Sequence, residues 1–175
     1  MNFINLTNDK MKTKIFTVII LMCITAVSFG QLREKDNLLG GTLGFWAHNK
    51  SPTFGFNYEN QISQAGAGTF GLGALMRFSN YTQDEREQFS NVFLGGQINY
   101  HFNQIESGKF VPFIGLVLGF YSSSPDGNTL KESGLWVWGQ TGARYFFSPA
   151  VAGVARIGLG NFNFNTLELG VDFKF

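Results

Sequence analysis

The feature that most restricts the fold is a run of short segments in which apolar and polar residues alternate with a period of two. The last segment, residues 166–175, shows it most clearly, because every second residue from Leu167 to Phe175 is apolar. The intervening positions hold Thr166, Glu168, Gly170, Asp172 and Lys174. A period of two is that of a β-strand with one apolar face, so the pattern predicts strands.

Eight segments of this kind follow residue 30, and turn-forming residues separate them. They cover residues 37–48, 53–62, 69–79, 91–102, 110–122, 134–147, 151–159 and 166–175. The polar stretches 80–88 and 123–132 are predicted to be the longer loops. An even number of antiparallel strands closes into an up-and-down barrel with both termini at one end.

The composition of the polar phase indicates which face is inside. Only 14% of residues are charged, against about a quarter in soluble domains, and the polar phase holds mostly Gly, Asn, Gln and Thr. Its few charges nearly cancel, which suits a narrow interior where each charge needs a partner. We therefore expect an all-β, eight-stranded antiparallel up-and-down transmembrane β-barrel with its apolar phase facing lipid.

The charged side chains of the inner phase are predicted to form a network that fills the lumen. The alternative is that they gate a narrow pore. The predicted network comprises Glu59, Arg77, Arg144, Arg156, Glu168 and Asp172. Trp136 and Trp138 also fall on the inner phase, so either they cap the outer end of the lumen or a bulge shifts the register there.

The N-terminus has the three-part layout of a signal peptide over residues 1–30. Lys10, Lys12 and Lys14 precede an apolar stretch at 15–27, and we expect cleavage after Gly30, with Met11 as an alternative start. The stretch is short for a membrane anchor, which is the other interpretation. Residues 31–36 then form a short lead, and residues 37–175 form the barrel. The single cysteine, Cys23, lies in the leader, so the mature chain has no disulfide or cysteine-based zinc site.

No catalytic, cofactor-binding or metal-binding residues are predicted. The two histidines, His48 and His101, lack a serine at a spacing that would make a nucleophile and base, and both are interpreted as polar residues at strand ends. The acidic run 84–87 lacks the alternating ligands and turn glycine of a calcium loop. A formal net charge of +1 offers no basic surface for nucleic acid.

The end of the chain resembles the C-terminal assembly signal of bacterial outer-membrane proteins. That signal has a polar residue, a glycine two positions on, an aromatic residue three further and a terminal aromatic residue, matched here by Glu168, Gly170, Phe173 and Phe175. Residues 37–175 resemble the outer membrane protein beta-barrel domain, or porin-like, family of small barrels. The resemblance implies export, insertion into a Gram-negative outer membrane by the barrel-assembly machinery, and outer-membrane lipid as the surroundings.

Fold does not select among the activities found on such barrels. The first hypothesis is a structural or membrane-integrity barrel without enzymatic activity. The second is a surface binding or adhesion module that holds a ligand through residues 80–88 and 123–132. A minor diffusion pore is the third, and a lipid-modifying barrel enzyme or a soluble lipocalin-like binder are less favoured.

Overall fold

The computed structural model describes residues 31–47, 51–83, 87–103, 108–125, 132–161 and 165–175, and all eight of its elements are strands. The predicted signal peptide and His48 lie outside these residues. Within the described residues there is no helix long and apolar enough to cross a membrane. The strands are β1 (Asn37–Trp46), β2 (Ser51–Ala65), β3 (Gly68–Gln83), β4 (Glu87–Phe102), β5 (Phe110–Pro125), β6 (Glu132–Ser148), β7 (Val151–Gly160) and β8 (Thr166–Lys174).

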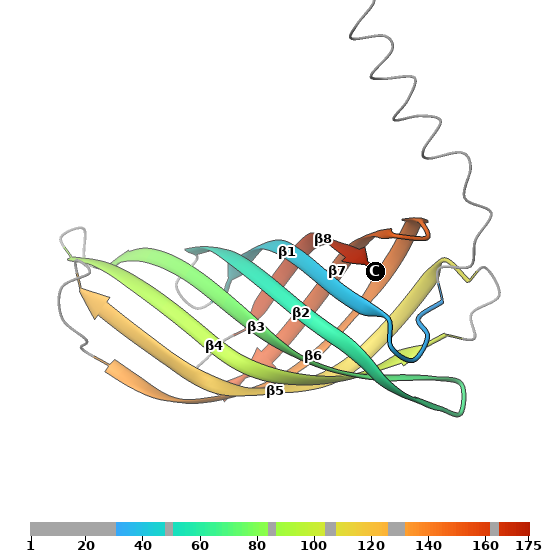
Figure 1. The fold of residues 1–175 in the computed structure, drawn as a ribbon. Coiled ribbons are helices and arrows are strands. Elements are labelled where there is room, and N and C mark those ends of the chain that lie inside the picture. The colour runs from blue at the N-terminus through green and yellow to red at the C-terminus, as the bar shows by residue number, and fades with distance from the viewer. Residues whose placement is uncertain (1–30, 48–50, 84–86, 104–107, 126–131, 162–164) are drawn as a thin grey trace, which may run out of the picture.

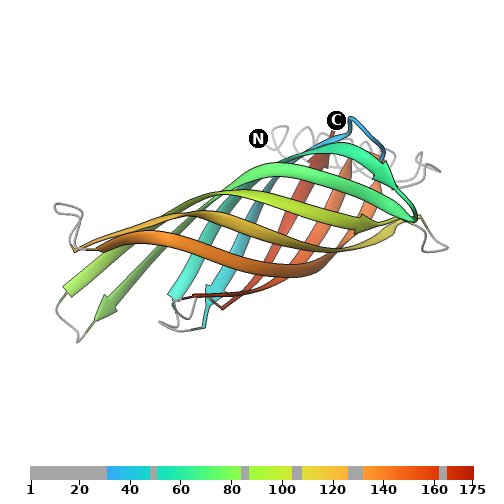
Figure 2. The same ribbon diagram turned by 90° about the horizontal axis from the view of Figure 1, so that it is seen from below.

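Each strand pairs antiparallel with the next, and β8 pairs with β1, so the sheet closes on itself (Figures 1 and 2). The β1–β8 seam runs from Leu38 opposite Lys174 to Trp46 opposite Thr166. The predicted eight-stranded up-and-down topology is thereby confirmed. We call the edge with the β1–β2, β3–β4, β5–β6 and β7–β8 connections the loop end, and the edge with residues 31–36 and Phe175 the terminal end.

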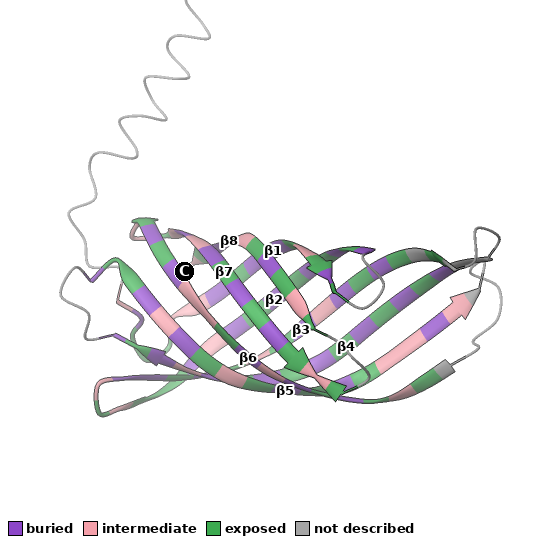
Figure 3. Cartoon of the chain, turned by 180° about the vertical axis from the view of Figure 1, so that it is seen from behind, coloured by how far each residue is buried: buried purple, intermediate pink, exposed green. Residues whose placement is uncertain are grey.

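Burial alternates residue by residue along the strands, as the banding in Figure 3 shows. Along β2, from Ser51 to Glu59, buried residues alternate strictly with exposed ones. The exposed phase carries large apolar side chains such as Phe54 and Phe56, whereas the buried phase carries Thr53, Asn57 and Glu59. The wall is therefore apolar outside and polar inside, in the phase that the sequence predicts.

The bounds of the two longer predicted loops are wrong, because strands β3 to β6 extend into them. Residues 80–83 belong to β3 and residues 87–88 to β4, with pairs from Asn80–Ser90 to Gln83–Glu87. Residues 123–125 likewise extend β5, and β6 begins at Glu132. Beyond the apolar band neither face of a strand needs to be apolar, so polar residues continue the ladder without alternating. The first predicted strand ends earlier, at Trp46, and the second begins earlier, at Ser51.

The register of β6 settles the placement of the two tryptophans. Gly119 lies opposite Trp136 and Val117 opposite Trp138, without an irregularity between them. Both indoles are buried in the lumen, so they cap its loop end. The register shifts lie elsewhere, between Gln61 and Ser63 in β2 and between Phe146 and Ser148 in β6.

Candidate functional site

The six charged residues predicted for the lumen all lie there, each with no more than 2% of its surface exposed. They come from β2, β3, β6, β7 and β8, so the network spans the barrel from wall to wall. Three carboxylates face three guanidinium groups. Because an unpaired buried charge is costly, this balance is what a closed interior requires.

One half of the network is centred on Glu168. Arg77 holds this carboxylate with two parallel bonds, Nε to Oε1 at 2.7 Å and Nη2 to Oε2 at 2.8 Å. Arg156 Nε lies 3.7 Å from Oε2, and Thr42 donates to the same oxygen at 3.3 Å. The fork therefore ties the last strand directly to β3 across the lumen.

The other half joins Glu59, His101, Arg144 and Asp172. Arg144 Nε donates to Asp172 Oδ2 at 2.6 Å, and its Nη2 donates to Glu59 Oε2 at 3.3 Å. Its Nη1 lies 3.1 Å from His101 Nδ1, while His101 Nε2 contacts Glu59 Oε1. Arginine can only donate, so Nδ1 accepts and the proton of a neutral imidazole resides on Nε2, facing Glu59. A neutral histidine keeps the three-to-three charge balance.

His101 is the member of this site that sequence reasoning missed. It is fully buried, whereas the sequence predicts only a polar residue at a strand end. The alternation along β4 could have predicted its burial, because His101 lies on the same inner face as Gln97 and Asn99, which are both buried. Those two amides continue the network: Asn99 Nδ2 donates to Glu59 at 2.8 Å, and Gln140 Nε2 donates to Gln97 at 3.1 Å.

Inner-phase glycines make the room that these long side chains occupy. A Cβ on Gly40 would overlap Asp172 Oδ1 and would come within 2.7 Å of the carbonyl oxygen of Val171. A Cβ on Gly55 would lie 2.7 Å from Cδ of Arg77. Asp172 and Arg77 thus lie over glycines of the neighbouring strand, because Gly40 is paired with Asp172 and Gly55 with Arg77.

Apolar clusters close the lumen on both sides of the network. At the loop end the cluster consists of Trp46, Leu75, Phe93, Val117, Trp136 and Trp138. At the terminal end it consists of Leu32, Leu38, Val111, Phe146 and Ala152. Leu32 comes from the short lead segment, and the side chain of Asn103 clamps it by accepting from its N–H at 3.4 Å and donating to its carbonyl at 2.8 Å.

Every strand contributes a lumen-facing side chain that is at most 2% exposed, so the interior is packed rather than water-filled. Examples from β1 to β8 in order are Leu38, Glu59, Leu75, His101, Val117, Trp138, Arg156 and Glu168. Among the described residues no cluster of three or more histidine, cysteine, aspartate or glutamate side chains could hold a metal ion. The imidazole and carboxylates of the network are out of reach of a substrate in this conformation.

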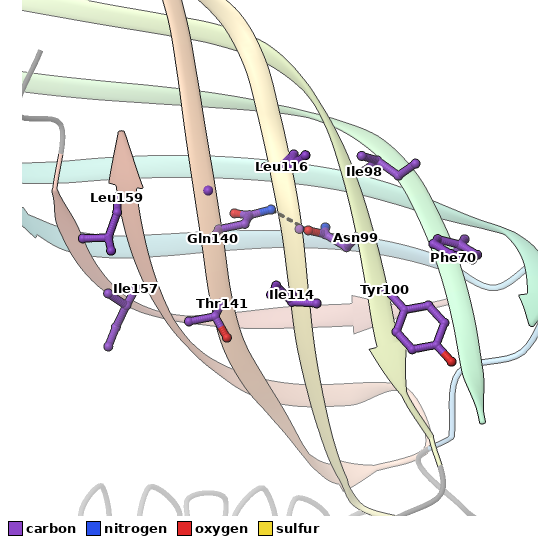
Figure 4. A pocket seen from close by; sticks show the side chains of 12 residues that line it. Phe70, Ile98, Asn99, Tyr100, Ile114, Leu116, Gln140, Thr141, Ile157 and Leu159 are labelled. Carbon is purple, nitrogen blue, oxygen red and sulfur yellow. Dashed lines mark hydrogen bonds between the residues drawn. The ribbon is translucent and has the colours of Figure 1, made fainter. Parts of the chain in front are cut away.

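The outer face carries a broad groove of about 580 Å³ over β3 to β7 (Figure 4). Leu116 and Ile157 stand at its sides, and Gly139 and Thr141 lie on β6 between them. The Thr141 hydroxyl is already bonded to the carbonyl of Phe113 at 3.1 Å. The groove is thus a shallow part of the apolar outer surface, and the Thr141 hydroxyl already donates its hydrogen to a protein carbonyl.

The four residues of the predicted assembly signal occupy different surroundings on β8. Glu168 lies in the lumen, and Gly170 is opposite Thr42, whose Cγ2 would lie 2.7 Å from an added Cβ. Phe173 and Phe175 are exposed on the outer face. Phe175 also continues the seam, because it exchanges two backbone hydrogen bonds with Asn37 at 2.8 and 3.0 Å.

No protein-family model and no curated protein sequence matches the chain. Solved structures do match. Neisserial surface protein A (NspA) superimposes with a TM-score of 0.58 at 17% identity over 80% of this chain and 95% of its own. The fold is that of a small outer-membrane β-barrel.

Two further barrels give the same result. The N-terminal domain of Pseudomonas aeruginosa OprF has a TM-score of 0.57 at 12% identity, over 81% of this chain and 98% of its own. Ail of Yersinia pestis in a phospholipid bilayer nanodisc has a TM-score of 0.55 at 11% identity, over 81% of this chain and all of its own (100%). At such identities the likeness concerns the fold, and activity has to be argued from this chain's own residues.

Proposed function

We propose that this protein is an integral outer-membrane barrel with a structural, membrane-integrity role that involves neither catalysis nor conduction. The observation that carries the proposal is the reversal of polarity across the wall. Large apolar side chains such as Leu116 and Phe120 are more than 60% exposed outside, while arginines and carboxylates are buried inside. A soluble lipocalin-like barrel would need the opposite arrangement.

The apolar outer band has the height of a membrane. On β5 the outward phase is apolar from Phe110 to Phe120. Ten residue steps of about 3.3 Å, tilted by about 40°, rise about 25 Å, which is the usual height of the lipid-facing band of such barrels. Exposed aromatic residues occur near both edges of the band, with Phe45, Phe54 and Phe78 at the loop end and Tyr145, Phe147 and Phe173 at the terminal end. These are the positions of interfacial girdles.

The packed lumen supports a role without conduction. A diffusion pore needs a continuous wet path, whereas both ends of this lumen hold apolar clusters and its middle holds paired charges. Burial of His101 and Glu59 likewise argues against a lipid-modifying enzyme, because a general base has to reach its substrate.

Migration on detergent gels before and after boiling tests this proposal. We expect the refolded protein to shift on boiling and the native protein to fractionate with outer membranes. Planar-bilayer recordings should show no discrete conductance steps, and phospholipid or lipopolysaccharide should not be turned over. A protein without a heat shift that fractionates as soluble material would refute the membrane assignment, and regular conductance steps would refute the closed lumen.

A surface-binding role is the second candidate, and the unequal strand lengths favour it. Strands β3 to β6 have 16 or 17 residues, whereas β1, β7 and β8 have 9 or 10. The four long strands project beyond the rest at the loop end (Figure 1). With the termini in the periplasm, this wall would stand above the membrane and would present residues 80–88 and 123–132 to a ligand.

Shortening both projecting hairpins tests the second candidate without altering the apolar band. Residues 80–88 and 123–132 would be replaced by two-residue turns, and cells displaying either protein would be compared for adhesion to protein-coated surfaces. A binding module should lose adhesion while keeping its heat shift. Equal adhesion by both proteins would count against the second candidate.

A further inference from the structure

The two apolar clusters that close the lumen are built differently. Every member of the cluster at the loop end lies in a strand, from Trp46 of β1 to Trp138 of β6. The cluster at the terminal end has four members from strands and a fifth, Leu32, from the lead segment, residues 31–36. Leu32 can therefore leave the lumen without breaking the ladder between any two strands, whereas the backbone of every loop-end member is fixed in a ladder.

The terminal-end cluster is the layer that separates one half of the charge network from solvent. Two of its strand members are direct neighbours of the charges, because Val111 is paired with Arg144 and Ala152 with Asp172. Leu32 packs into the same cluster and is only 2% exposed. Loss of Leu32 from this layer would leave a gap on the path from the terminal end to these two charges.

The lead segment is attached at several points around the mouth of the barrel. Asn103, which directly follows β4, holds the backbone of Leu32 through two hydrogen bonds. Two backbone hydrogen bonds of 2.7 and 2.8 Å join residues 35 and 36 to Gln61 of β2. Lys174 of β8 donates to the carbonyl of Gln31 at 3.2 Å, and its Nζ lies 3.6 Å from Asp36 Oδ2. The segment is held over the mouth by these polar attachments and by the buried side chain of Leu32.

Two further features distinguish the lead segment from the wall. A cleft of about 500 Å³ is lined by residues 31–34 and by Gly66 and Ala67 of the β2–β3 turn, so these two parts are not packed together. The turn at the base of the segment holds Lys35 at a φ of 74°, in the left-handed region that lysine seldom adopts. The closed position thus depends on the attachments and not on the preference of the backbone.

We propose that residues 31–36 are a lid that opens the lumen at the terminal end alone, with Leu32 as the side chain that seals it. When the lid opens, Leu32 leaves the cluster and water enters as far as Arg144 and Asp172. The cluster at the loop end stays closed, so the lumen becomes a wet pocket with one mouth and the barrel does not conduct. The lid involves only the lead segment and the mouth, so it stands apart from the role proposed for the whole protein.

Two buried valines on the inner face of β5 can report on the two ends separately. Val111 belongs to the terminal-end cluster and Val117 to the loop-end cluster, and both are at most 1% exposed. Cys23→Ser removes the only native cysteine, so Val111→Cys or Val117→Cys then introduces a single thiol. The rate at which a water-soluble methanethiosulfonate reagent modifies this thiol is measured on the refolded protein in detergent micelles, where the reagent reaches both ends.

Leu32→Asp places a charge on the sealing side chain and should open the lid. We expect this change to raise the modification rate at position 111 about tenfold and to leave the rate at position 117 unchanged, because only one end opens locally. Asn103→Ala removes the clamp and should raise the rate at position 111 by a smaller factor. Lys35→Gly is the control, since glycine adopts a positive φ freely, and it should keep position 111 protected.

An unchanged rate at position 111 in the Leu32→Asp variant would overturn the proposal. Equal acceleration at positions 111 and 117 would also overturn it, because the whole barrel would then have loosened. The heat shift on detergent gels shows whether each variant is folded. If Leu32→Asp and Asn103→Ala both abolished the shift, the lead segment would be an integral part of the barrel and not a lid.

Discussion

The outer and inner faces of the barrel wall differ in how strongly each side chain depends on its neighbours. On the outer face of β5, Ile114, Leu116 and Leu118 are more than half exposed, and any large apolar residue would serve there. On the inner face, Arg77 uses all five donors on fixed partners, and Gly40 leaves the space that Asp172 fills. The outer face thus requires a class of residue, whereas the inner face requires particular residues.

Removing one partner of the inner network should have the largest effect. Arg77→Met leaves Glu168 with the Thr42 hydroxyl and one more distant guanidinium, that of Arg156. Breaking a buried ion pair in this way costs about 3–5 kcal/mol of folding free energy. Denaturant unfolding of the refolded protein in lipid vesicles measures the loss. The double variant Arg77→Met/Glu168→Gln removes both charges and should recover part of it. A single variant within about 1 kcal/mol of wild type would show that the pairing is not critical.

The free-energy cost of a charge on the outer face should depend on its depth in the lipid, because no partner side chain is involved. Leu116→Lys places a cation in the middle of the apolar band, where the cost is about 2–4 kcal/mol. Phe120→Lys, at the loop end of the same strand, is the matched control and should cost about 0–1 kcal/mol. Unfolding in vesicles of defined lipid separates the two. Equal losses at both depths would contradict the placement of the band.

Gly40 and Gly41 are adjacent in β1 but face opposite sides of the wall. Gly40→Ala drives a methyl group into Asp172 and the Val171 carbonyl, so we expect a loss of about 1–3 kcal/mol from overpacking. Gly41→Ala meets only the carbonyl oxygen of Gly55 at 3.8 Å, an ordinary contact, and should be neutral or slightly stabilising. Thermal melts of the two variants compare the faces directly. Similar Tm values for both variants would mean that the inner face can accommodate an added methyl group without a loss of stability.

Deletion of Phe175 should have the smallest effect on equilibrium stability. The side chain is exposed, and its backbone makes two of the hydrogen bonds at the seam. If residues 168–175 act as the assembly signal, the truncated protein should insert more slowly in cells while refolded protein keeps nearly normal stability. Pulse-chase labelling with the heat shift as readout measures insertion. A normal rate of insertion would contradict the assembly role of these residues but would not contradict the barrel fold.

The alternation of residues predicted the number of strands, their order and the phase of each face. Strand ends were less predictable, because Asn80 and Ser123 are polar residues in strands that continue past the apolar band. Beyond that band the lipid no longer selects for apolar residues, and the pattern of period two disappears although the backbone pairing continues.

The sequence predicted which residues belong to the site, but it did not predict which of them contact one another. The inner phase indicates that Glu59 and Arg144 face the lumen, yet their partners lie on strands far apart in the chain, and strand tilt and stagger decide which groups meet. His101 shows the same limit, because its phase was visible and its partners were not. Leu32 precedes the first strand, so no strand pattern could predict its burial in the lumen.

Tryptophan quenching by lipids with brominated acyl chains tests the reversed wall most directly. All three tryptophans, Trp46, Trp136 and Trp138, are buried in the lumen. In reconstituted bilayers we expect weak quenching of the native protein, and additional strong quenching when Leu116→Trp adds an indole on the outer face. Strong quenching of the native indoles, or no further quenching from position 116, would contradict an apolar face against lipid and a packed lumen within.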